Sequence, residues 1–275
     1  PYRGGMRRLA LLAPAILLLA GCATSAPPPP AAGGADPVDL VGLWRVSDAE
    51  GADERTWLRL DAGELTLWQE CGYLSGAWVA TDALFLGSIY GGNGDCISGN
   101  RVPELPWLEA AAGYTRTGDG WALTDAGGAV VATLSVDGAP APHPDIIDDY
   151  TRPPVVTDAT REALAPAAPL PSGFEVADVT GRWVATAPGA PEQPFVEFAP
   201  DGSWTGSDGC NGGAGRWASD GRGGLLTTSG VSTLIGCDGV QVPGMVASAR
   251  SAGMQFGELV LFDAAGQELG RLQRG

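Results

Sequence analysis

The pattern of hydrophobic and polar residues along the chain predicts short β-strands separated by tight turns. Between residues 38 and 136, runs such as GLWRVS, GAWVA and LFLGS alternate large apolar residues with small or polar ones. A period of two is typical of a strand that buries one face. TWLRLDAGELTLW predicts a hairpin around Asp61-Ala62-Gly63, and GWALTDAGGAVVATL predicts another. We therefore expect an antiparallel sheet in this half.

The pattern recurs between residues 178 and 275. GRWVATA, GRWAS and GLLTTSG predict strands, FVEFAPDGSWTGSD predicts a hairpin around a Pro-Asp-Gly turn, and ELVLFDAAGQELGRL predicts a closing hairpin. VPGMVASARSAG is helix-like, with Pro243 near its start and Gly253 at its end, and ELPWLEAAAG is its counterpart in the first half. The expected fold class is mainly β (α+β). It comprises two small antiparallel, curved-sheet or barrel-like domains, each with one short helix.

The two halves share rare residues at a nearly constant offset, which predicts one fold present twice. The offset is 139 residues for three pairs and 138 or 141 for three more. The pairs are Trp44 and Trp183, Cys71 and Cys210, Trp78 and Trp217, Asp125 and Asp263, Leu134 and Leu272, and Cys96 and Cys237. QECGYLSGAW is thus the counterpart of SDGCNGGAGRW. It lacks Asp208 and Asn211, so we interpret the stretch as a structural corner, in which Asn211 caps a turn or adopts a left-handed conformation.

The segment MRRLALLAPAILLLAGC (residues 6–22) predicts export. Arg7 and Arg8 precede a short apolar run from Leu9 to Ala20, too short for the roughly 30 Å membrane core and typical of a signal peptide. Leu19-Ala20-Gly21-Cys22 resembles a bacterial lipobox, which implies cleavage before Cys22, a diacylglyceryl thioether on its sulfur and palmitate-type acyl chains in the anchor. The alternative is an ordinary signal peptide with a chance Cys. We expect translation to begin at Met6, downstream of the residues at positions 1–5.

These features give the expected domain boundaries. A signal peptide (1–21) is followed by a Pro/Ala-rich tether (22–37), a first domain (38–136), a linker or strap (137–177) and a second domain (178–275). In the linker, TDATREAL (157–164) predicts two helical turns. The linker is either a flexible spacer or a strap packed on the second domain. Its apolar residues favour the strap: Ile146, Ile147, Tyr150, Val155 and Val156.

Composition excludes many common chemistries. All 16 basic residues are Arg, and the single His143 lies in a Pro-rich connector; Schiff-base chemistry, P-loop phosphate binding, His-based triads and multi-His metal sites therefore have no residues to use. The net charge of −16 comes without a basic stripe, so we expect no nucleic-acid partner.

Carboxylates are the only abundant titratable groups, so an enzyme of this sequence would have to use a pair of them for catalysis. Candidate acids are Glu64, Glu70, Asp95 and Asp208, although solvated surface acids are the simpler interpretation. GGNGDC and SDGCNGG cluster oxygen ligands suited to Ca²⁺, but each has only one or two carboxylates. We therefore assign no catalytic, cofactor-binding or metal-ligating residue and expect no cofactor.

Four cysteines remain besides Cys22, and exported chains favour disulfides. Four cysteines allow three connectivities, and the repeat favours Cys71–Cys96 with Cys210–Cys237. Four free buried thiols are the alternative.

The second half resembles the META/HslJ domain family. The resemblance rests on a Trp-led first strand, a GCN…G…W strand pair and an ST…C segment, here Trp183, Gly209-Cys210-Asn211, Gly215, Trp217, Ser232-Thr233 and Cys237. The family motif carries paired cysteines, which supports Cys210–Cys237. The first half resembles a divergent copy, with Gly72 in place of the Asn. The resemblance implies small β-rich domains, often on lipoproteins and linked to stress and envelope resistance, and brings no catalytic residues.

The sequence thus favours a non-enzymatic cell-envelope lipoprotein with a binding or scaffolding role in the envelope or stress response. The alternative is a carrier of a lipid or small apolar ligand in a domain cavity. Expected partners are the membrane, through Cys22, and an envelope protein or apolar ligand; the oligomeric state stays open. An exposed cluster among the five non-repeating tryptophans would mark a partner surface: Trp57, Trp68, Trp107, Trp121 and Trp204.

Overall fold

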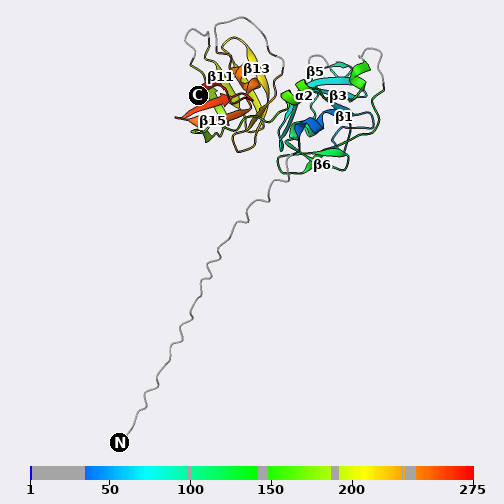
Figure 1. Cartoon of the computed structure of the whole chain (residues 1–275), viewed down its shortest axis with the longest axis horizontal. Coiled ribbons are helices and arrows are strands. Elements are labelled where there is room, and N and C mark those ends of the chain that lie inside the picture. Colours follow the sequence, from blue (N-terminus) through cyan, green and yellow to red (C-terminus); the bar gives the residue numbers. More distant parts are fainter. Residues whose placement is uncertain (2–34, 98–100, 142–147, 187–191, 231, 233–239) are drawn as a thin grey trace. The chain divides into compact units, whose positions relative to one another are not determined.

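The computed structural model describes residue 1 and residues 35–97, 101–141, 148–186, 192–230, 232 and 240–275 (Figure 1). The predicted signal peptide, Cys22 and nearly all of the tether lie outside these residues, as do His143 and Cys237. Residues 34–275 form one compact unit. Within the described part of the chain, no helix is long and apolar enough to cross a membrane.

The first half folds into an eight-stranded antiparallel sheet with the order β5-β4-β3-β2-β1-β8-β7-β6. A bridge between Leu84 and Gly113 brings the two outer strands together, so the sheet curls into a barrel. A 3₁₀ helix (η1, Pro37–Leu40) precedes the sheet, and a short helix, α1 (Pro106–Ala110), lies between β5 and β6. The strands are β1 (Gly42–Ser47), β2 (Trp57–Leu60), β3 (Glu64–Gln69), β4 (Gly72–Ala80), β5 (Phe85–Gly94), β6 (Gly113–Thr117), β7 (Gly120–Thr124) and β8 (Val130–Ser135).

The second half forms a nine-stranded antiparallel sheet with the order β14-β13-β12-β11-β10-β17-β16-β15-β9. A bridge between Gly224 and Ser251 joins β14 to β15, and helix α3 (Val242–Ser248) precedes β15. The strands are β9 (Glu175–Val176), β10 (Gly181–Val184), β11 (Phe195–Phe198), β12 (Ser203–Ser207), β13 (Gly212–Ser219), β14 (Leu225–Thr227), β15 (Ser251–Gln255), β16 (Glu258–Phe262) and β17 (Glu268–Arg274). The predicted mainly β fold class is confirmed.

The two sheets have the same topology, strand by strand. Strands β1–β8 correspond to β10–β17, with one helix between the fifth and sixth strands of each set, and β9 is an addition at the edge of the second sheet. Local contacts repeat as well. The indole Nε1 of Trp44 donates to the carbonyl of Leu40 at 2.8 Å, and that of Trp183 to the carbonyl of Val179 at 2.7 Å.

One glycine of the repeated motif is required by a close backbone approach. A Cβ on Gly76 would lie 2.1 Å from the carbonyl oxygen of Ser88, and a Cβ on Gly215 would lie 1.9 Å from that of Thr228. Both distances are far below van der Waals contact, so only glycine fits where the fourth strand of each sheet crosses the fifth. This explains the shared Gly-x-Trp in the two halves.

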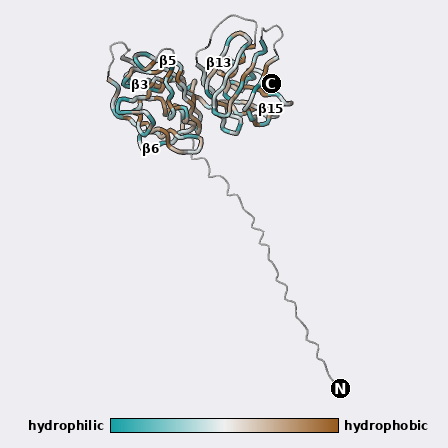
Figure 2. The backbone as a smooth tube through the Cα atoms, turned by 180° about the vertical axis from the view of Figure 1, so that it is seen from behind, coloured by the Kyte–Doolittle hydropathy of each residue, from teal (hydrophilic) through white to brown (hydrophobic). Residues whose placement is uncertain are grey.

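Large side chains fill the interior of both sheets. Trp78, Trp121 and Phe85 are fully buried in the first, and Trp204 and Phe198 in the second. Figure 2 shows hydrophobic and hydrophilic residues interleaved along the strands, as expected for sheets with one buried face.

The five non-repeating tryptophans do not form an exposed cluster. Each is at most 4 % exposed. Trp57 and Trp68 pack with Leu43, Tyr73 and Tyr150 in a small cluster of their own, and Tyr150 belongs to the linker. These five tryptophans are therefore core residues and mark no exposed partner surface.

Two helices are shorter than predicted. The structure ends α3 at Ser248 and places Gly253 inside β15, where it pairs with Val260 of β16. Gly113 likewise belongs to β6 instead of closing the first helix. Sheet pairing overrides local helix propensity at both positions. The additional strands β6 and β15 complete the two barrels.

The linker is a strap that packs on both sheets. Helix α2 (Asp158–Ala163) begins at Thr157 with a capping box to Thr160, and Leu164 joins the first core. Farther on, β9 pairs with β15. We predicted that the strap would pack on the second domain, and the structure shows that it packs on the first as well. Val155 is 77 % exposed, and Ile146 and Ile147 lie outside the described residues.

Candidate functional site

Cys71 and Cys210, at equivalent corners of the two sheets, are both disulfide-bonded. Cys71, just before β4, is bonded to Cys96, just after β5, in the pairing that the repeat favours. Cys210, just before β13, is also disulfide-bonded. Its expected partner, Cys237, lies outside the described residues, and so does the expected lipidation site, Cys22.

The SDGCNGG stretch is organised around the buried carboxylate of Asp208, which is 1 % exposed. One of its oxygens accepts hydrogen bonds from the backbone N–H groups of Cys210 and Asn211 at 2.8 and 2.6 Å. The other accepts from the side-chain amides of Asn211 and Gln241 at 3.0 and 2.9 Å. Burial raises the pKa of this carboxyl, but the hydrogen bonds outweigh burial and lower the pKa to about 2.

This geometry corrects two expectations about the corner. Asp208 is not a solvated surface acid, because both of its oxygens are occupied inside the fold. The turn is capped by Asp208 itself, and the residue with a left-handed backbone is Gly209, at φ 96°, rather than Asn211. A carboxylate held ionised by four donors favours a structural role over acid catalysis.

The other candidate acids lie apart from Asp208. Glu64, Glu70 and Asp95 are exposed residues of the first half, and Glu70 pairs with Arg55. Among the described residues, no three His, Cys, Asp or Glu side chains come together as a metal-binding set. In the part of the chain that the structure describes, the four candidate acids Glu64, Glu70, Asp95 and Asp208 therefore do not come together as a pair.

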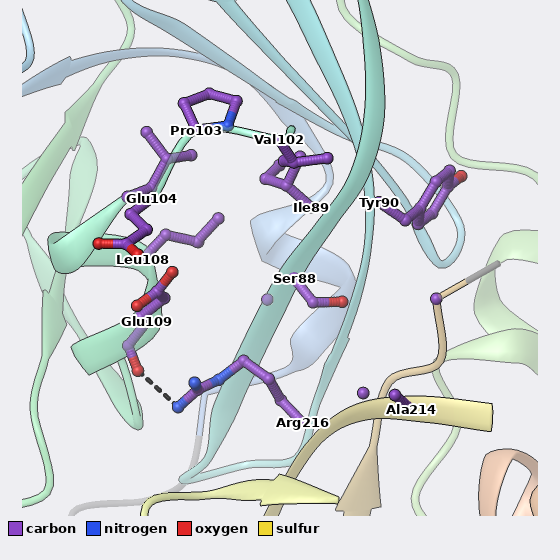
Figure 3. Close-up of a pocket in the computed structure, with 14 residues that line it drawn as sticks. Ser88, Ile89, Tyr90, Val102, Pro103, Glu104, Leu108, Glu109, Ala214 and Arg216 are labelled. Atoms are coloured by element: carbon purple, nitrogen blue, oxygen red, sulfur yellow. Dashed lines mark hydrogen bonds between the residues drawn. The ribbon is translucent and has the colours of Figure 1, made fainter. Parts of the chain in front are cut away.

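A pocket of about 530 Å³ lies between β5, the segment that leads into α1, and β13 (Figure 3). Its volume is in the range of small-molecule and peptide sites. Figure 3 shows Glu104, Leu108 and Glu109 along one wall, Ser88 and Ile89 on β5, and Arg216 reaching across from β13. The remaining labelled lining residues are Tyr90, Val102, Pro103 and Ala214.

The pocket contains hydrogen-bonding groups that the described part of the chain leaves unused. Arg216 Nη2 donates to the backbone carbonyl of Glu109 at 2.7 Å, while Arg216 Nε and Ser88 Oγ are buried atoms without a hydrogen-bond partner among the described residues. Unpaired buried polar atoms are uncommon and point to a partner that completes them. Burial, with a contribution from Glu64, also raises the pKa of Tyr90.

Sequence reasoning did not identify this pocket. Its residues come from four separate stretches, so no local motif could indicate them. One signal was present in the repeat, where the motif Gly-x-Trp has Ala77 in the first copy and Arg216 in the second. A charged residue at a position that the other copy fills with alanine indicates a role specific to the second copy.

Together, the fold and the pocket define a disulfide-containing protein of two repeated antiparallel β-barrels with a polar pocket beside β5. Residues 168–275 match the model of the META domain family, so the second half of this chain is a META domain. The shared strand order supports a second, divergent domain of the same kind in the N-terminal half. Searches of curated proteins and of solved structures found no match for the chain.

Proposed function

We propose that this protein is a non-enzymatic, lipid-anchored protein of the cell envelope that binds a partner molecule in the pocket beside β5. The observation that carries the proposal is a pair of buried hydrogen-bonding atoms, Ser88 Oγ and Arg216 Nε, that have no partner among the described residues and belong to residues lining a ligand-sized pocket. The candidate acids are scattered or fully occupied, which favours binding over catalysis. The META domain and the signal-peptide-like start support a role in the envelope or its stress response.

The apolar-carrier alternative has to use the same pocket. Both barrel interiors are filled by large side chains such as Trp78 and Trp204, which leaves little room for a lipid inside either barrel. The pocket beside β5 is partly apolar through Ile89, Val102 and Leu108, but it also exposes Glu104 and Glu109. A ligand with polar groups suits this lining better than a lipid chain does.

Thermal unfolding in the presence of envelope-derived peptides and small molecules tests the binding role. A ligand that binds only the folded state raises the midpoint temperature of unfolding. At a ligand concentration one hundred times the dissociation constant, it adds about 2.7 kcal/mol to the free energy of unfolding. We expect Ser88→Ala and Arg216→Gln to reduce this shift, and Arg182→Gln, on β10, to leave it unchanged. Turnover of any of these compounds that disappears on substitution of one carboxylate would contradict the proposal.

The anchor is tested separately, by mass spectrometry and membrane fractionation of the protein expressed in bacteria. The unsubstituted chain should lose residues 1–21, carry acyl chains on Cys22 and sediment with membranes. Cys22→Ser should be soluble and unacylated, since stable anchoring needs several acyl chains. An unacylated Cys22 in the unsubstituted protein would show that the segment is an ordinary signal peptide.

A further inference from the structure

β5 is paired along only part of its outer edge. The bridge between Leu84 and Gly113 and the hydrogen bond from the Phe85 N–H to the Ala112 carbonyl, 3.0 Å, join the beginning of β5 to the start of β6. Next to the following residues of β5 the chain forms α1 instead of a strand. The edge beside the pocket is therefore left without a ladder partner in the described part of the structure.

The phase of the β4–β5 ladder identifies the backbone groups on this open edge. The Thr81 N–H donates to the Leu84 carbonyl at 2.9 Å, and in an antiparallel pair alternate residues bond to the same neighbour. Leu86 and Ser88 consequently bond to β4. Gly87 and Ile89 direct their N–H and C=O groups outward, toward the pocket that both residues line.

These outward groups are unsatisfied within the described residues. The structure gives no hydrogen bond from them to any described residue outside the β4–β5 ladder, and Gly87 is buried. Buried backbone groups without a partner are rare in folded proteins because each costs the energy of its lost hydration.

The spacing and charge of the pocket point to one kind of occupant. Two residues on alternate positions of a strand present the donor and acceptor pattern that an extended peptide pairs with. The opposite wall carries the exposed carboxylates of Glu104 and Glu109, and the chain has a net charge of −16. Basic side chains complement this wall. Arg216, which also lines the pocket, adds an Nε–H donor that has no hydrogen-bond partner among the described residues.

We propose that the pocket binds an extended segment of another protein, rich in Lys or Arg, which adds to the first sheet as a strand paired with Gly87 and Ile89. This proposal rests on the proposed function and names its ligand class. Backbone pairing supplies the contact along the edge, and Glu104 and Glu109 select positively charged side chains.

Amide hydrogen exchange by NMR on the full mature chain with Cys22→Ser tests the proposal. The probe is a short end-blocked peptide of alternating Lys and Val. In the free protein the amides of Gly87 and Ile89 should exchange fast, and those of Leu86 and Ser88 should be protected. Saturating peptide should slow Gly87 and Ile89 by on the order of tenfold or more. A peptide of alternating Lys and Pro lacks the Val N–H groups needed for pairing and should leave them fast.

Two further comparisons separate pairing from charge. A peptide of alternating Glu and Val should bind much more weakly. The double variant Glu104→Gln/Glu109→Gln should weaken the Lys-Val peptide by about two- to fivefold per charge, while Glu50→Gln, which removes an exposed charge elsewhere, should not.

Three results would overturn the proposal. They are protection of Gly87 and Ile89 in the free protein, equal binding of the Glu-Val peptide, and binding of the Lys-Val peptide without added protection. If a small molecule instead gives the Arg216-dependent thermal shift described above, the binding role stands and only the peptide assignment fails. If no tested compound or peptide binds in the pocket, the proposed function fails with it.

Discussion

Asp208 shows why a conspicuous polar residue in a motif can be structural. Its carboxylate is inaccessible and accepts four hydrogen bonds from the turn that it closes and from Gln241. The sequence predicted a structural corner correctly from the loss of Asp208 in the first copy. It could not predict the burial, because Gln241 is 33 residues away along the chain and no pattern links the two.

We expect Asp208→Asn to lower the free energy of unfolding at neutral pH by about 2–3 kcal/mol, because an amide nitrogen would face the amide donors of Asn211 and Gln241. The folded-state pKa of Asp208 is lowered to about 2, against about 3.9 in an unfolded chain. Its stabilisation is therefore complete above pH 4 and is lost as the pH falls toward 2. Urea unfolding from pH 7 to pH 2 should show the two proteins converging.

A matched substitution controls for charge in this experiment. Glu175→Gln removes an exposed carboxylate of β9 and should parallel the unsubstituted protein at every pH. If the two proteins differed by the same free energy of unfolding at every pH down to 2, the hydrogen bonds would not lower the pKa of Asp208, and the account would be contradicted.

At the scale of elements, the β15–β16 turn contains an unfavourable residue. Phe256 and Gly257 both have positive φ, at 52° and 82°, as a two-residue type I′ turn requires. Phenylalanine is poorly suited to the left-handed region, and this side chain is 94 % exposed, so no packing compensates the strain. This turn was not predicted, because the helix-like segment was expected to end at Gly253 and no strand was predicted between it and ELVLF.

Phe256→Asn should stabilise the second domain by about 1 kcal/mol, since asparagine tolerates a positive φ. Calorimetry should show a midpoint higher by about 4–8 °C for a domain of this size. Phe256→Leu, which keeps the strain and changes the exposed apolar surface, should give no gain. An unchanged or lower midpoint for the Asn variant would show that Phe256 makes a stabilising contact.

A disulfide-bonded cysteine precedes the fourth strand of each sheet, Cys71 before β4 and Cys210 before β13. Cys71–Cys96 closes a loop with a sequence separation of 25, which in the chain-entropy model stabilises the first domain by roughly 3–4 kcal/mol. We expect Cys71→Ser/Cys96→Ser to unfold at lower denaturant concentration and to lose the effect of added reductant on that transition. If reductant still lowered the unfolding midpoint of the double variant, the disulfide of Cys210 would be the bond whose reduction destabilises the protein.

At the scale of the whole molecule, the sequence predicted what repeats and missed what does not. Equal offsets of Trp44 and Trp183 or of Cys71 and Cys210 indicate equivalent places in two folds, and the strand orders agree. The pocket has no such repetition. It arises where α1 diverges from β5 and where Arg216 of the second copy reaches Glu109 of the first, contacts that depend on three-dimensional packing.

The strap illustrates the same limit. Its helix could be predicted from the cap at Thr157, and the structure gives α2 at that place. The sheet that the strap contacts could not be predicted, because the strap contacts both. Tyr150 stacks against Tyr73 of the first sheet, and Phe174 packs against Phe262 of the second. Apolar residues in a linker indicate that it packs, but they do not specify its partner.

The most direct test of the binding role is the NMR signal of the Arg216 Nε–H group. The atom is buried and has no hydrogen-bond partner among the described residues, so a ligand in the pocket beside β5 should change its surroundings more than those of any other arginine. We predict that any compound or peptide that raises the thermal midpoint also shifts this signal, and that Arg182 Nε stays constant. A bound ligand that leaves Arg216 unshifted and moves signals elsewhere would contradict the account.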